Sequence, residues 1–198
     1  MHASSEQQAR LLALQKAFAE VCNALAPIVQ QNRCWNRVTL HHLAYRTLRT
    51  RFPAIGSQMV CNAIYSVCRT ARIVFQHPAS PMHVSRFGDK PLPLMEFSDN
   101  SPVYFDRHTL SVKSGQLSMF TLDGRMHFQV ALTPADEVRF HNEKLHEVVL
   151  SHAQSGPFEL SFWFTEESAG AREARAHAGN LRGSFPEYVK VEVPHEIR

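Results

Sequence analysis

Two predicted helices carry side chains suited to binding phosphates and unpaired bases. In the first, His42, Arg46 and Arg49 recur at i, i+4 and i+7, with Tyr45 beside them. In the second, a run at i, i+4, i+7, i+11 and i+14 consists of Gln58, Asn62, Tyr65, Arg69 and Arg72. Each spacing places its set along one side of a helix. Arginine and amide groups donate to phosphate oxygens, and tyrosine rings stack on bases, so the sequence predicts a nucleic-acid-binding surface.

The distribution of charge favours the same interpretation. Residues 1–72 contain nine basic and two acidic side chains, a net charge of +7, whereas residues 73–198 contain twelve basic and sixteen acidic ones, a net charge of −4. Such a division predicts a polyanionic partner for the first segment. A basic helical face also suits an acidic protein or a lipid surface, or is solvated without any ligand, and these alternatives stay open.

No set of residues in the sequence predicts catalysis or metal binding. Three protein ligands are needed for a catalytic zinc, and neither the adjacent pair His41 and His42 nor Asp106 with His108 supplies them. Nucleotide-binding and hydrolase motifs such as G-x-S-x-G and H-E-x-x-H are absent. No C-x-x-C pair occurs, which favours buried free thiols at Cys22, Cys34, Cys61 and Cys68. We therefore expect no enzyme activity, no metal and no cofactor.

The basic residues must be positioned by helices at the start of the chain. Apolar residues recur at threes and fours, which predicts helices over residues 5–31, 39–51 and 57–71. Pro27 is expected to end or kink the first helix, and Thr39 to cap the second. Gly56 separates the second helix from the third. We expect these elements to form a three-helix module over residues 1–76.

In the remainder of the chain, residues 77–198, apolar and polar residues alternate with a period of two, which is typical of β-strands. A Pro-rich loop over residues 78–102 precedes a meander that turns at Ser114-Gly115 and Asp123-Gly124. Residues 166–185 are predicted to be a flexible excursion. The expected strands are 109–113, 116–122, 125–131, 145–151, 158–165 (with Phe158, Leu160, Phe162 and Phe164 on one face) and 188–193. The chain is thus expected to be α+β, with helices followed by a small antiparallel β-barrel or sandwich.

Nothing in the sequence predicts export or membrane insertion. We find no apolar run near the ~18–20 residues that a membrane span needs. The amino terminus, MHASSEQQAR, lacks the apolar core of a signal peptide. We therefore expect a soluble cytoplasmic protein.

Two stretches resemble the amino-terminal half of a known family. The first is SEQQARLLALQKAFAEVCNALAPIVQQN, continued by TLHHLAYRTLRTRFPAIGSQMVCNAIYSVCRTAR, and the second is VYFDRHTLSVKSGQLSMFTLDGRMHF. Together they lie within residues 5–132. They are similar to the patterns of TnpB, the transposon-encoded RNA-guided nuclease that is related to type V CRISPR effectors.

The resemblance implies a recognition lobe built from the helices and a wedge-like β-barrel built from the strands. In that family both parts grip the guide RNA and the duplex of guide and target. The helical motif contains Tyr45, Arg46, Arg49, Gln58 and Asn62, and the strand motif contains Asp106, Gly124 and Arg125. Gly124 suits the turn better than a ligand.

The RuvC-type nuclease and the zinc ribbon of the family have no counterpart in the sequence, so the resemblance implies binding without cleavage. We expect a non-catalytic protein that binds structured RNA or an RNA/DNA duplex, with a separate RuvC-type nuclease subunit as a further partner. The alternative is a protein-interaction module, an accessory or inhibitory subunit of a nuclease complex. The candidate nucleic-acid-binding residues are Arg33, Arg37, His42, Tyr45, Arg46, Arg49, Arg51, Gln58, Asn62, Tyr65, Arg69, Arg72 and Arg125.

Overall fold

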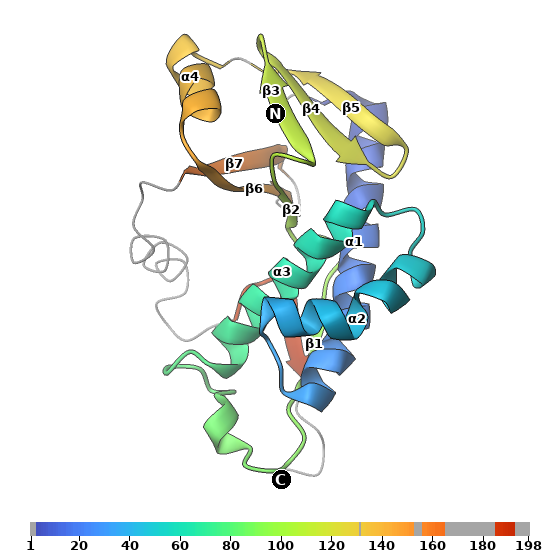
Figure 1. Cartoon of the computed structure of the whole chain (residues 1–198), viewed down its shortest axis with the longest axis vertical. Coiled ribbons are helices and arrows are strands. Elements are labelled where there is room, and N and C mark those ends of the chain that lie inside the picture. The colour runs from blue at the N-terminus through green and yellow to red at the C-terminus, as the bar shows by residue number, and fades with distance from the viewer. Residues whose placement is uncertain (1–2, 131, 153–155, 165–184, 193–198) are drawn as a thin grey trace.

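Helices and antiparallel strands make up the structure, a computed structural model that describes residues 3–130, 132–152, 156–164 and 185–192 (Figure 1). The expected α+β class is confirmed at this level. The helices are α1 (Ser5–Asn32), α2 (Arg37–Arg51), α3 (Ser57–Phe75) and α4 (Pro134–Asn142), with a 3-10 turn at Val84–Arg86. The strands are β1 (Leu94–Phe97), β2 (Val103–Phe105), β3 (Leu110–Lys113), β4 (Gln116–Thr121), β5 (Gly124–Gln129), β6 (Leu145–His152), β7 (Phe158–Phe164) and β8 (Val189–Glu192).

Helix α1 begins at a capping box and runs through its proline. The Ser4 side chain accepts from the Gln7 backbone N–H, and the Gln7 side chain accepts from the Ser4 backbone N–H. The expectation that Pro27 ends or kinks this helix is wrong about the end, because α1 continues to Asn32. Burial of Val29, beyond the proline, holds the helical path despite the missing hydrogen bond.

Helix α1 is long and apolar enough to cross a membrane, although the sequence analysis found no apolar run of that length. Half of its most apolar window is buried inside the structure, and both a core helix of a soluble protein and a signal sequence near the amino terminus pass the same test.

Helix α2 begins two residues before the expected position. Its cap is Asn36, not Thr39: the Asn36 side-chain oxygen accepts from the backbone N–H groups of Val38 at 3.0 Å and Thr39 at 3.1 Å. Arg37 therefore lies in the first turn of α2. Helix α3 begins as expected after Gly56 and extends to Phe75, beyond the expected end at residue 71.

The strands form three open antiparallel sheets within the described residues, in the orders β1-β8, β2-β6-β7 and β3-β4-β5. No closed barrel is formed by these strands. The meander β3-β4-β5 was expected, and its turns carry the positive φ angles that tight hairpins require, 51° at Ser114, 72° at Gly115 and 90° at Gly124. The expected excursion over residues 166–185 lies outside the described residues except for Phe185.

Strands β1 and β2 and helix α4 were not expected. Strand β1 lies inside the predicted Pro-rich loop and pairs with β8, placing Phe97 opposite Val189. Helix α4 follows the meander, where Thr133 caps it with a capping box completed by Asp136.

One buried apolar cluster joins the helices to the strands across the expected boundary at residues 76 and 77. Helix α1 contacts α2 and α3, and it also contacts β1, β2 and β4. Its Asn23 side chain makes two hydrogen bonds with the backbone of Phe97, donating at 2.8 Å and accepting at 2.7 Å. The largest fully buried side chains come from both segments and include Phe18, Phe75 and Phe105. The helices and the strands are therefore one packed unit in the described residues.

Candidate nucleic-acid interface

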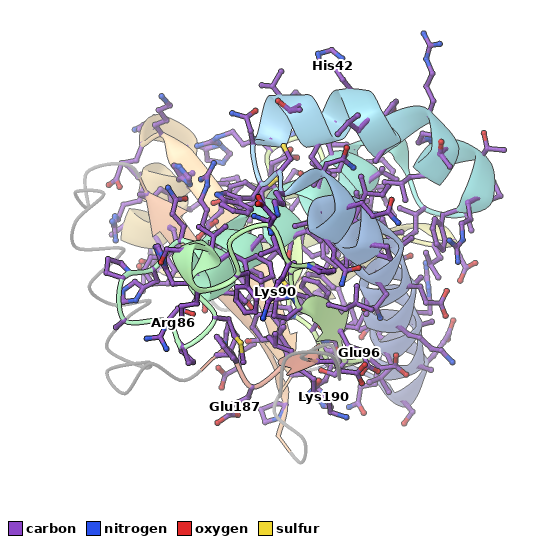
Figure 2. The ribbon with its side chains drawn as sticks, turned by 90° about the horizontal axis from the view of Figure 1, so that it is seen from below. His42, Arg86, Lys90, Glu96, Glu187 and Lys190 are labelled. Carbon is purple, nitrogen blue, oxygen red and sulfur yellow. The ribbon has the colours of Figure 1, made fainter. Side chains whose placement is uncertain are left out.

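One side of α2 is buried and the opposite side faces solvent. Leu40, Ala44 and Leu48 recur every four residues and are at most 2% exposed. His42 and Arg46 lie on the opposite side and are exposed. In Figure 2 the labelled His42 projects from α2 away from the rest of the chain. The outer side of α2 is therefore accessible to a partner.

The segment that contains α2 has no acidic side chain. Residues 21–88 include eight arginines but neither aspartate nor glutamate. Four of the arginines lie on α2: Arg37, Arg46, Arg49 and Arg51. No carboxylate of α2 itself competes for them, so phosphate oxygens are suitable partners.

Two of these four arginines also have partners inside the chain. The Arg49 guanidinium donates to the backbone carbonyl of Ile55, beyond the end of α2. The Arg51 guanidinium lies 5.2 Å from the centroid of the Phe52 ring. Both lie in the last turn of the helix, where cations complement its dipole. Arg46 and Arg51 are exposed, whereas Arg49 is half-buried.

An aromatic flank accompanies the arginines of α2. The His41 ring stacks on the Tyr45 ring, with centroids 4.5 Å apart and planes 18° apart. Nearby, the Arg37 guanidinium lies 5.5 Å from the centroid of the Tyr65 ring on α3. Stacked rings beside guanidinium groups are a common platform for unpaired bases. The sequence reasoning missed His41, although its i, i+4 spacing to Tyr45 was a usable signal.

The polar side of α3 faces the sheet rather than solvent along most of its length. Gln58 donates to the Asp106 carboxylate at 2.7 Å, and Asn62 donates to the Tyr104 carbonyl at 3.0 Å. Asn62 is only 5% exposed. The sequence analysis places these two side chains on a nucleic-acid-binding surface. This expectation is wrong, because β2 packs against α3 here and the two side chains bond to residues of the chain itself.

Tyr65 and Arg69 complete this junction with a buried carboxylate. Glu147 of β6 is 5% exposed and accepts from the Tyr65 hydroxyl at 2.8 Å and from Arg69 Nη1 at 2.9 Å. Burial lowers the pKa of Arg69, but Tyr104 and Glu147 raise it more, so the guanidinium stays charged. Burial raises the pKa of Tyr104, whose hydroxyl accepts from Arg69 at 3.4 Å. These groups bind α3 to the sheet.

The other candidate residues lie at separate places. Arg33 is in the left-handed conformation at the end of α1 and donates to the Lys90 carbonyl. Arg72 is exposed near the end of α3. Arg125 lies on β5, with its guanidinium 4.3 Å from the Phe120 ring centroid. Figure 1 places the sheet of β5 at one end of the molecule, away from α2.

The structure thus unites only part of the predicted set. The candidates that share α2 are Arg37, His42, Tyr45, Arg46, Arg49 and Arg51. Those at the α3–sheet junction are Gln58, Asn62, Tyr65 and Arg69. In the described part of the chain no group of three or more His, Cys, Asp or Glu side chains could hold a metal ion.

No protein-family model matches the chain, and no curated protein matches it significantly. The relationship to TnpB-like nucleases therefore stays a prediction from the quoted sequence patterns.

Proposed function

We propose that this protein is a non-catalytic nucleic-acid-binding protein that binds structured RNA or an RNA/DNA duplex through the outer side of α2. The observation that carries the proposal is the exposed basic helix α2, which has four arginines and no acidic residue. Arg46 on the outer side and Arg51, exposed in the last turn, are phosphate ligands, and the Tyr45–His41 stack offers a flat ring surface on the same helix.

The resemblance to TnpB supplies the class of ligand and partner in this proposal. The chain is derived from, or acts with, a TnpB-like RNA-guided nuclease in the cytoplasm. Its helices correspond to the recognition lobe, and its strands correspond to the wedge-like barrel. A separate RuvC-type nuclease subunit supplies the cleavage chemistry.

The test is binding to a structured RNA and to an RNA/DNA duplex across a salt series. Removing two phosphate ligands with Arg46→Ala and Arg51→Ala should weaken binding and lower the slope of log K against log salt by about one unit per lost contact. A matched control, Lys113→Ala with Lys190→Ala, removes two exposed positive charges from strands.

The control should change binding much less than the α2 pair does. Equal losses in the two variants would show that only net charge matters, and no binding at low salt would refute the proposal. With Mg²⁺ present the bound RNA should remain intact, and cleavage that is lost on mutating the chain's own carboxylates would contradict the non-catalytic assignment.

A second candidate function, a protein-interaction module in a nuclease complex, is supported by strand β7. It lies at the edge of its sheet in the described residues. Leu160, Phe162, Trp163 and Phe164 of this strand are only half-buried. An edge strand with apolar side chains can pair with another chain. Binding to a purified nuclease that survives the α2 substitutions but is lost on Phe162→Ser would favour this function.

A further inference from the structure

The connection between α1 and α2 lies against α3, and each of these two segments carries a cysteine. Cys34 lies in this short connection and is half-buried. Cys68 lies on α3 and is 2% exposed. All four cysteines of the chain are free thiols in the structure.

Two contacts hold the connection against α3 on either side of Cys68. The Trp35 ring lies 5.9 Å from the Phe75 ring, and its indole N–H donates to the Gln76 side chain at 3.1 Å. Arg37 lies over Tyr65, ten residues earlier on α3. Cys68 falls between these two contacts, and positions 65, 68, 72 and 75 share one side of a helix.

The electrostatic surroundings of Cys68 agree with this placement. Burial raises the pKa of Cys68 to about 11, while Arg72 and Arg37 lower it and the Cys34 thiol raises it. Cys34 is therefore an electrostatic neighbour of Cys68, which agrees with the contacts that hold the connection against α3. The other thiols have different surroundings: Cys22 is buried on α1 beside Ser66, and Cys61 has Arg37, Asp106 and Arg49 as neighbours.

We infer that Cys34 and Cys68 are a redox-sensitive pair that closes a disulfide between the α1–α2 connection and α3. With hydrogen peroxide as the oxidant, the Cys34 thiolate attacks one peroxide oxygen, the O–O bond breaks, and the leaving hydroxide takes a proton to become water. Cys34 is then a sulfenic acid. The Cys68 sulfur attacks the Cys34 sulfur, the S–O bond breaks, and the leaving hydroxyl group takes the proton lost by the Cys68 thiol to become a second water. Two thiols are oxidised and one peroxide is reduced.

Exposure assigns the order of the two steps. Cys34 is half-exposed and not constrained by a helix, so it meets the oxidant first. Cys68 is buried and so meets the oxidant less readily than Cys34, which leaves it to attack second, once the Cys34 sulfur is a sulfenic acid. The non-helical connection can make the small movement that disulfide geometry demands.

The disulfide would close a loop over residues 34–68, which contains the whole of α2. Closing a loop of this length restricts the unfolded chain, so we expect Tm to rise by about 5–10 °C on oxidation. It would also fix the amino-terminal end of α2, which carries Arg37.

The experiment treats the whole protein with peroxide, alkylates the remaining thiols and maps disulfides after trypsin digestion. Trypsin places Cys34 in a peptide of residues 34–37, and both Cys61 and Cys68 in residues 52–69. The Cys61→Ser variant leaves Cys68 as the only cysteine in the longer peptide. We expect the two peptides to be linked in the wild type and in Cys61→Ser, and the Tm rise to reverse with reductant.

Cys34→Ser is the main control. Because Cys34 is only half-buried, the reduced variant should melt at the same temperature as the reduced wild type. After peroxide treatment this variant should show neither the linked peptides nor the rise in Tm. A link from Cys34 to Cys61, a link between two chains, or complete alkylation of Cys34 after peroxide treatment would overturn the inference. So would an unchanged oxidative Tm rise in Cys34→Ser.

Discussion

Replacing Glu147 with alanine should strongly weaken the attachment of α3 to its sheet. The Glu147 carboxylate accepts from Arg69 at 2.9 Å and from the Tyr65 hydroxyl at 2.8 Å. Alanine removes both interactions and leaves the Arg69 charge without its acidic partner. Removing one member of a buried ion pair costs roughly 3–5 kcal/mol.

The structure places this change below that range. The Arg69 side chain is 31% exposed, whereas the Glu147 side chain is 7% exposed. Water can therefore partly solvate the guanidinium that the substitution leaves behind. We therefore expect a loss of about 2–3 kcal/mol in the free energy of unfolding. For a chain of this size, this corresponds to a fall in Tm of about 4–12 °C.

Thermal and urea unfolding measure the effect, with Asp123→Ala as the matched control. Asp123 pairs with Arg10 at 3.9 Å and its side chain is 78% exposed, so its loss should cost less than about 1 kcal/mol. The double variant Arg69→Met with Glu147→Leu should be more stable than Glu147→Leu alone, because it leaves no unpaired charge. Equal Tm values for Glu147→Ala and Asp123→Ala would refute the reasoning.

Three more predictions concern other parts of the fold. Asn36→Ala should cost about 1 kcal/mol and reduce helicity, measured by circular dichroism and urea unfolding, since it removes the cap of α2. Phe18→Ala should cost roughly 3–5 kcal/mol in urea unfolding, and Phe162→Ala clearly less, because Phe18 is fully buried and Phe162 is not. Burial raises the pKa of Cys22 from 9.0 and of Tyr104 from 10.0, so the folded state keeps protons that the unfolded chain loses. The stability that these two groups contribute should therefore be constant below about pH 9 and fall above it, so Tm should fall from about pH 9 to about pH 11, less steeply in Tyr104→Phe; a flat Tm profile over this range would contradict this.

Much of the local structure could be predicted from the sequence. The three amino-terminal helices follow from apolar periodicity, and the β3-β4-β5 meander follows from its Gly-containing turns. The cap of α2 was missed because both Asn36 and Thr39 are good capping residues, and only the backbone geometry distinguishes them. Strand β1 was missed because prolines surround it, and its pairing with β8 joins residues that are far apart in the sequence.

The candidate site shows what periodicity leaves undetermined. A period of 3.6 identifies which residues share one side of a helix, but not what packs against that side. On α2, His42 and Arg46 face solvent, whereas Arg49 is half-buried and donates to the Ile55 carbonyl. On α3 the polar side is covered by β2 and β6, because Glu147 and the backbone of Tyr104 supply partners for Arg69 and Asn62. These partners lie at least 42 residues away in the chain, so local sequence reasoning could not find them.

Mapping the residues that touch RNA tests the central claim most directly. A structured RNA bound at low salt is irradiated with ultraviolet light, and the cross-linked peptides are identified after trypsin digestion. If nucleic acid lies on α2, cross-links should concentrate in the peptide of residues 38–46, which contains His41, His42 and Tyr45. Cross-links confined to the strands, or none in the presence of RNA, would contradict the account.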